Sequence, residues 1–252
     1  MNTMLTDISI LWPALIAGVL VAISHVPLGQ QVLSRGIVFI DLAIAQVAGL
    51  GVIAANCFEL AIDGWGAQIA AGAAALAGAL LLTWTERIWP EVQEAVIGVV
   101  FIVAANLAIL LLAANPHGAE HLKDLLVGQI LWVTPGRLAW VAVASAVIAA
   151  TWFAFGAKMG RVGFYVLFAC AVTVAVQLVG LYLVFATLIV PALATRALSR
   201  GRIGVGYAIA ALSYGAGLAV SMASDLPAGP LIVCTMTGVG LGAYLAARPR
   251  AA

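Results

Sequence analysis

Apolar residues gather in long runs along the whole of this chain, and short polar or charged segments separate the runs. The runs approach the ~20 residues that an α-helix needs to cross a bilayer. They lack the regular alternation of apolar and polar residues that marks a strand of a membrane β-barrel. The pattern therefore predicts an all-α polytopic membrane protein with about nine spans (eight to ten). We expect these spans near 9–31, 37–57, 65–84, 95–114, 138–157, 163–179, 181–197, 204–223 and 228–247.

Two stretches need more than a simple span. If 163–197 begins and ends on one side, it must cross and return within few residues. Two short helices that turn near Gln177 to Gly180 would fit, and so would a partly re-entrant segment. The stretch 118–134 is too polar at its start to cross a bilayer. It predicts a re-entrant half-helix that dips in from the outer face and is broken by Pro135–Gly136.

The composition agrees with a membrane protein and adds little else. Only 8% of the 252 residues are charged, whereas a soluble domain carries roughly 25%. The N-terminal segment has no basic leader and carries Asp7 before its apolar run, which predicts a retained first span. The three cysteines form no CxxC pair, so we expect small packing residues and not a disulfide framework or a thiolate zinc site. With no linker or repeat, 1–252 is expected to be one transmembrane domain.

The placement of basic residues predicts the orientation. Of the 11 lysines and arginines, two would lie outside, Lys123 and Arg137, if the C-terminus lies in the cytoplasm. The others would lie inside: Arg35, Arg87, Lys158, Arg161, Arg196, Arg200, Arg202, Arg248 and Arg250. This asymmetry is what the positive-inside rule requires. We therefore expect the N-terminus outside and the C-terminus in the cytoplasm.

The segment 115–129 holds the densest group of polar side chains. His117, Glu120 and His121 stand at positions i, i+3 and i+4, which share one face of a helix. Imidazole and carboxylate groups on one face suit a divalent transition metal. The alternative is a solvated outer loop whose charges serve only solubility.

The order His-x-x-Glu-His also occurs in one class of zinc peptidases, where the glutamate acts as general base. Such a site takes a further ligand from downstream. Here the only downstream acids are Asp124 and Asp225, and Asp225 has no helical partner motif. An intramembrane peptidase is therefore kept only as an alternative.

Four polar residues within the expected spans are candidates for a function. A carboxylate at Asp41 costs at least ~2.5–3.5 kcal/mol to insert, which makes it a metal or gating candidate, unless it pairs with Arg35 or a neighbouring helix. Gln46 lies about 140° around the helix from Asp41 and need not share its face. His25 is a metal ligand or a structural hydrogen-bonding residue. Gln177, beside a helix break, either faces a pathway or caps a helix.

Several functional classes lack their signatures. The chain has no GxxxxGK[ST] phosphate loop, no nucleophile elbow and no basic patch of the kind that binds nucleic acid. Asp41 is the only clearly intramembrane acid, so coupling to an ion gradient has no obvious machinery. We expect that the chain is not itself an enzyme and that its energy comes from another chain.

Five segments follow one another along the chain: VLSRGIVFIDLAIAQVAGLGV, PEVQEAVIGVVFIVAANLAIL, EHLKDLLVGQILWVTP, QLVGLYLVFATLIVPALATR and SDLPAGPLIVC. In these segments and in their order, the sequence resembles the permease subunits of bacterial ABC importers for zinc and manganese. The resemblance implies a helical bundle that dimerises, sits on two cytoplasmic ATPases that bind ATP, and takes metal from an extracytoplasmic binding protein. No permanently bound cofactor is implied. Many members carry an aspartate and a histidine where this chain has Leu42 and Gln46, so another set of groups must meet the metal.

The resemblance also implies a role for the basic loop 196–202. A short cytoplasmic helix of such permeases docks into the ATPase, which would place Arg196, Arg200 and Arg202 at that contact. The alternatives are plain positive-inside anchoring and docking through the 86–95 loop.

The sequence therefore predicts the multi-pass permease of a divalent-metal ABC importer in a bacterial cytoplasmic (inner) membrane, with zinc as the first choice and manganese as the second. Candidate metal-contacting residues are His117, Glu120, His121, Asp41 and His25, and candidate pathway or gating residues are Gln46 and Gln177. A permease for a metal chelate, such as a siderophore or corrinoid, is the alternative within transport.

Overall fold

The computed structural model of the chain describes residues 2–57, 65–112, 130–224 and 226–247. Within these ranges the chain forms α-helices joined by short turns, and no strand occurs there. The helices are α1 (Asn2–Arg35), α2 (Ile40–Cys57), α3 (Trp65–Ile88), α4 (Gln93–Leu112), α6 (Pro135–Phe155), α7 (Arg161–Val179), α8 (Leu181–Ala194), α9 (Arg202–Ser224) and α10 (Ala228–Ala247). Three 3-10 turns accompany them, η1 (Pro90–Val92), η2 (Ile130–Trp132) and η3 (Gly156–Lys158).

Each span expected from the sequence corresponds to one of these helices, so the predicted polytopic α-helical fold is confirmed. In the part of the chain that the structure describes, 7 helices are long and apolar enough to cross a membrane. The two shorter apolar helices are α2 and α8. At 14 residues, α8 is about 21 Å long, which is less than the ~30 Å hydrocarbon core.

The difficult stretch 163–197 folds as two consecutive helices, one of the two arrangements that the sequence allowed. The break between α7 and α8 is Gly180, whose φ of +84° lies in the region that side-chain-bearing residues avoid. The backbone N–H of Gly180 donates a 2.9 Å hydrogen bond to the carbonyl oxygen of Val176. The chain can therefore turn inside the protein without leaving that amide unpaired.

The expected break at Pro135–Gly136 falls where a new helix begins. Pro135 is the first residue of α6, so this helix starts before the position 138 expected from the sequence. Thr134 caps that helix, since its hydroxyl accepts a hydrogen bond of 3.4 Å from the backbone N–H of Arg137. Proline suits the first turn of a helix, where its missing N–H would have no partner. Most of the expected half-helix, 118–129, lies outside the described residues.

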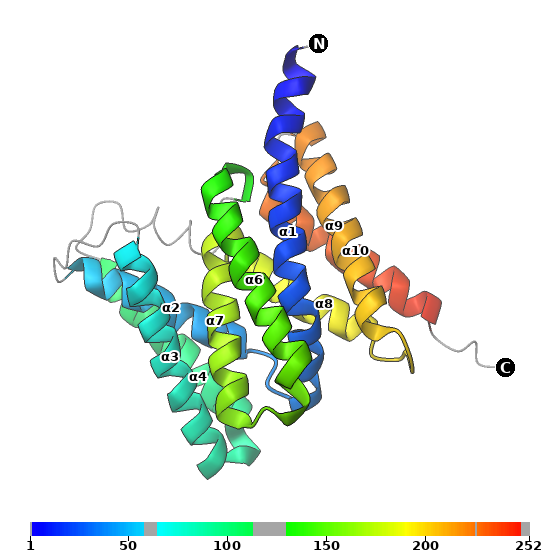
Figure 1. Cartoon of the computed structure of the whole chain (residues 1–252). Helices are drawn as coiled ribbons and strands as arrows, with labels where there is room; N and C mark the ends of the chain where they lie inside the picture. Colours follow the sequence, from blue (N-terminus) through cyan, green and yellow to red (C-terminus); the bar gives the residue numbers. More distant parts are fainter. Residues whose placement is uncertain (1, 58–64, 113–129, 225, 248–252) are drawn as a thin grey trace.

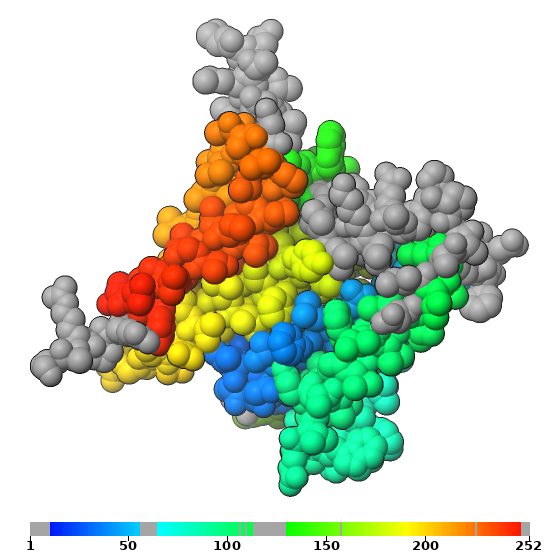
Figure 2. All heavy atoms as spheres, turned by 180° about the vertical axis from the view of Figure 1, so that it is seen from behind, coloured from blue at the N-terminus to red at the C-terminus, as the bar shows by residue number. Residues whose placement is uncertain are grey.

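The helices form two groups (Figure 1). One consists of α2, α3 and α4, and the other of α1, α8, α9 and α10. Between them, α7 packs against α1, α2, α3 and α8, and α6 packs against α1 and α7. Seen from behind, the α8–α10 side and the α2–α4 side of the molecule diverge from each other (Figure 2).

Glycine permits the closest helix contacts. A Cβ atom on Gly29 of α1 would lie 1.9 Å from the carbonyl oxygen of Leu188 in α8. On Gly217 of α9 it would lie 2.6 Å from the Cα of Ile232 in α10. Small residues allow such approach in membrane proteins, where van der Waals packing drives association.

Candidate functional site: buried carboxylates and a basic loop

The predicted outer metal-receiving residues His117, Glu120 and His121 lie outside the described residues, so their role stays a prediction. Across the ranges that the structure describes, no group of three or more His, Cys, Asp or Glu side chains could hold a metal ion. The site must therefore be described from smaller groups of polar residues.

Asp41 lies in the first turn of α2 and is the most deeply buried acid that the structure describes. Its side chain is 0% exposed, and neither carboxylate oxygen has a hydrogen-bond partner among the described residues. The backbone N–H groups of Asp41 itself and Leu42 act on the carboxylate electrostatically. The N-terminal end of a helix carries a partial positive charge, so this position favours a carboxylate even without a cationic partner.

A second acid, Glu94, stands close to Asp41. Glu94 lies in the first turn of α4, and its Oε1 accepts a 3.2 Å hydrogen bond from the backbone N–H of Phe39, two residues before Asp41. The two carboxylates are near enough to interact electrostatically. The Oε2 atom of Glu94 has no partner among the described residues. Two neighbouring carboxylates with unused oxygens form a site that attracts a cation.

The anticipated alternative, a pair between Asp41 and Arg35, does not form. The Arg35 guanidinium lies over the Phe164 ring, 4.2 Å from the ring centre. Among the described residues no basic side chain makes an ion pair with Asp41 or Glu94. The sequence reasoning missed Glu94, although it has the same signature as Asp41: an acid in the first turn of an apolar helix.

Gln46 lies on a different face of α2 from Asp41, as their spacing predicted. Gln46 and Leu42 are one helical turn apart and both are half-buried, whereas Asp41 is buried completely. Leu42 and Gln46 are therefore more accessible than Asp41, and they present an apolar side chain and an amide.

His25 is buried in α1. Its Nδ1 atom lies 3.0 Å from both the Ser24 hydroxyl and the carbonyl oxygen of Val21. The Nε2 atom has no hydrogen-bond partner within the described residues. The ring thus has a structural hydrogen bond on one nitrogen and an unused nitrogen on the other. Neither His25 nor Asp41 belongs to a group of three or more ligand-type side chains among the described residues.

Gln177 is half-buried in the last turn of α7. Its side-chain oxygen accepts a hydrogen bond from the Gln68 amide of α3. This bond connects residues 109 positions apart in the sequence, so the pattern of residues could not have identified Gln68. The pair fastens α3 to α7 beside the break at Gly180.

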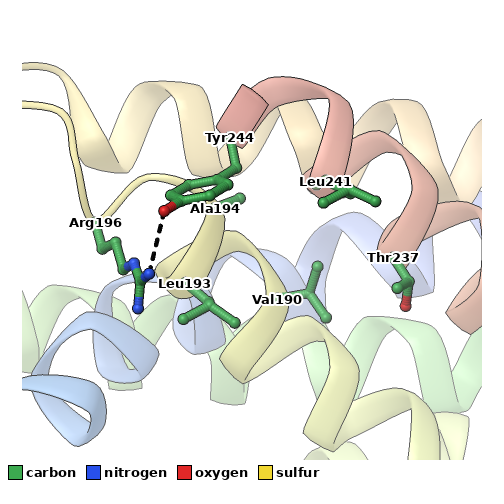
Figure 3. A pocket seen from close by; sticks show the side chains of 8 residues that line it. Val190, Leu193, Ala194, Arg196, Thr237, Leu241 and Tyr244 are labelled. Carbon is green, nitrogen blue, oxygen red and sulfur yellow. Dashed lines mark hydrogen bonds between the residues drawn. The ribbon is translucent and has the colours of Figure 1, made fainter. Parts of the chain in front are cut away.

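The basic loop 195–201 joins α8 to α9. Arg196 of this loop donates a 3.2 Å hydrogen bond to the hydroxyl of Tyr244 in α10 (Figure 3). A cavity of about 330 Å³ lies between the end of α8 and α10. Its lining is apolar apart from a few groups and consists of Val190, Leu193, Ala194, Arg196, Thr237, Gly240, Leu241 and Tyr244.

Comparison with known proteins places this helical architecture in a class of transport proteins. The model of the ABC 3 transport family matches residues 7–162 and 154–247. The chain therefore belongs to the ABC 3 transport family, whose members are metal ABC transporter permeases.

Two solved structures share the fold. One is PsaBC from Streptococcus pneumoniae in complex with Fab, with a TM-score of 0.77 and 22% identity over 93% of this chain and 91% of that chain. The other is a transporter assigned to the metal-chelate type of ABC transporter, solved in an inward-facing conformation. Its TM-score is 0.67, with 13% identity over 93% of this chain and 85% of that chain.

Proposed function

We propose that this chain is the membrane-spanning subunit of an ATP-binding-cassette importer for a divalent transition metal, with zinc as the first candidate and manganese as the second. The observation that carries the proposal is the family match, which extends over nearly the whole chain. The chain acts as a single transmembrane domain over 1–252. ATP is bound and hydrolysed by a separate cytoplasmic subunit, and the metal is cargo.

The proposed assembly follows from the same family. Two copies of the chain form a homodimer in the bacterial cytoplasmic membrane, with the N-termini outside and the C-termini in the cytoplasm. An extracytoplasmic binding protein delivers the metal to His117, Glu120 and His121. The basic loop that carries Arg196, Arg200 and Arg202 faces the ATPase.

The buried Asp41 and the half-buried Glu94 support a cationic cargo. Asp41 and Glu94 offer oxygens that no side chain of the described residues neutralises. His25 offers an unused imidazole nitrogen in α1. A path with few ligands suits transport, because tight binding would trap the metal. Gln46 and Gln177 are proposed pathway or gating residues that add only neutral amides.

One observation favours a metal chelate as the second candidate cargo. The metal-chelate type transporter shares the fold at a TM-score of 0.67. The apolar Leu42 and the amide of Gln46 on the accessible face of α2 also suit a ligand whose metal is already coordinated. In that case the external binding protein would provide most of the specificity.

Uptake of radiolabelled zinc and manganese, each free and chelated, tests the proposal in proteoliposomes that contain the full chain, its ATPase and its binding protein. Asp41→Asn and His121→Ala should each reduce free-metal uptake at least tenfold. Glu91→Gln, an exposed acid of η1, is the matched control and should leave uptake unchanged. Uptake of the chelated metal alone would reject the free-ion proposal. No uptake of either form by an assembled complex that hydrolyses ATP would reject metal as the cargo.

A further inference from the structure

The loop between α8 and α9 is held in shape by Arg202. The Nη2 atom of Arg202 donates a 2.9 Å hydrogen bond to the carbonyl oxygen of Arg196, and its Nε atom donates to the carbonyl oxygen of Leu198. Gly201, with φ at +73°, supplies the turn that brings the chain into α9. Thr195 closes the other end, since its hydroxyl donates 2.7 Å to the carbonyl oxygen of Pro191. The loop is therefore a preformed unit.

Arg196 links this preformed loop to the last helix. Besides the 3.2 Å hydrogen bond to the Tyr244 hydroxyl, its guanidinium lies 5.2 Å from the centre of the Tyr244 ring. Both contacts come from one side chain and reach residue 244 across 48 positions of the sequence. Figure 3 shows this contact at one end of the cavity, beside Leu193 and Ala194.

The Arg196–Tyr244 contact and the closest contact between α10 and α8 lie at different positions along α10. Gly240 touches α8, because a Cβ there would lie 2.7 Å from Cγ1 of Val190. Tyr244 is one helical turn beyond Gly240. Between the two helices at this level lies the cavity of about 330 Å³. A displacement of the loop can thus move the end of α10 about the Gly240 contact, because the cavity leaves room for it.

Arg200 differs from Arg196 and Arg202, the other two arginines of this region. Its side chain is exposed and makes no hydrogen bond or ion pair among the described residues. Residues 187–252 contain a single acid, Asp225. Nothing in the neighbouring sequence can therefore neutralise this guanidinium. An unpaired arginine on a rigid loop suits a carboxylate-bearing partner surface, where its planar group can form two parallel hydrogen bonds.

We infer that the three loop arginines have separate tasks: Arg200 binds an acidic surface of the partner ATPase, Arg202 holds the loop in shape, and the Arg196–Tyr244 contact carries loop movement to α10. This inference rests on the proposed function, because it assumes that the loop faces the ATPase. Arg196 and Arg202 are then positioning residues, and Arg200 alone makes the intermolecular contact.

The test uses the full chain in lipid nanodiscs for ATPase binding and in proteoliposomes for metal uptake per ATP hydrolysed. Arg200→Ala should weaken binding of the ATPase about tenfold, as for an arginine at the centre of an interface. Tyr244→Leu should leave the ATPase dissociation constant within twofold and reduce uptake per ATP at least fivefold. Tyr182→Leu removes an exposed tyrosine of α8 and serves as the matched control, with both values unchanged.

A double-mutant cycle separates coupling from damage to the fold. Arg196→Ala should reduce uptake per ATP as much as Tyr244→Leu does, and the double variant should lose no more. Additive losses, or unchanged uptake in Tyr244→Leu, would overturn the role of the contact. Unchanged ATPase binding in Arg200→Ala would overturn its assignment. If replacing all three arginines by glutamate also leaves binding unchanged, the proposed ATPase contact itself fails.

Discussion

Two turns of this protein compete for the contact with an ATPase, and they are built in different ways. The 86–95 turn joins α3 to α4, and the 195–201 loop joins α8 to α9. Both follow the end of an apolar helix and both carry charge. Their sequences give no reason to prefer one. Their packing does, because the first is fastened to several helices and the second is fastened mainly to itself.

The 86–95 turn is held by buried hydrogen bonds. Gln93 is 4% exposed and its amide donates 3.0 Å to the carbonyl oxygen of Leu82 and 3.4 Å to the Tyr165 hydroxyl. Its side-chain oxygen accepts a 3.1 Å bond from Thr85. Glu86 pairs with Arg161 of α7 at 3.7 Å. Gln93, Thr85 and Glu86 are therefore already engaged within the protein, while Arg87 and Glu91 stay exposed.

The 195–201 loop carries an exposed arginine, Arg200, that makes no hydrogen bond or ion pair among the described residues. Arg196 of the loop contacts Tyr244 of the distant helix α10. Breaking an exposed contact costs little, whereas leaving a buried polar group without a partner costs about 1–3 kcal/mol. A turn with satisfied, buried partners is suited to fixing helices. A loop whose contacts are exposed can change partner, and this difference favours 195–201 for the proposed docking role.

The largest expected effect is on the 86–95 turn. Gln93→Ala removes three hydrogen bonds and leaves the Tyr165 and Thr85 hydroxyls with fewer partners, so the free energy of unfolding should fall by about 2–3 kcal/mol. Equilibrium unfolding in mixed micelles measures it. Glu91→Ala, exposed two residues earlier, is the control and should change stability by less than about 0.5 kcal/mol. Equal effects of the two substitutions would remove the contrast between the turns.

A smaller effect is expected at the contact of α8 with α10. Gly240→Ala places a methyl group 2.7 Å from Cγ1 of Val190, and the β-branched valine cannot rotate freely away. The unfolding free energy should fall by about 1–2 kcal/mol through overpacking. Gly238→Ala is the matched control, because no atom lies within 4 Å of a Cβ added at this position. That variant should be neutral or slightly stabilising, and a loss equal to that of Gly240→Ala would contradict the Gly240 contact.

The smallest effect concerns the ion pair of the 86–95 turn. In the Arg161–Glu86 pair the side chains are 52% and 15% exposed, so water and salt screen the interaction. Arg161→Ala should lower the unfolding free energy by less than about 1 kcal/mol, and the difference should shrink at high salt. Arg200→Ala, without a partner in the described chain, should show no salt-dependent difference. A large salt-independent loss in Arg161→Ala would show that the turn depends on this pair more than on Gln93.

The order and type of the helices could be predicted because apolar length alone requires them in a bilayer. Gly180 could likewise be identified as the break near Gln177. The start of α6 was misplaced, because Pro135 can end one segment or begin another and only the Thr134 cap decides between them. The α8 helix proved shorter than a full span, since Thr195 closes it before the loop.

The candidate site was predictable only in part. An acid or histidine inside an apolar helix is visible in the sequence, so Asp41 and His25 could be named as candidates. Glu94 was missed, because nothing in the sequence brings the start of α4 beside the start of α2. Gln68 and Tyr244 were missed for the same reason: each meets its partner only after helices distant in sequence have packed.

The sequence by itself determined the membrane-spanning class, the helices and the family, because these follow from apolar runs and from motifs read along one chain. Tertiary structure alone decided which polar groups are used up and which are free. Asp41 is buried without a cation, Gln93 is satisfied, and Arg200 is exposed. Those outcomes depend on which helix faces each side chain, and packing between distant segments sets that.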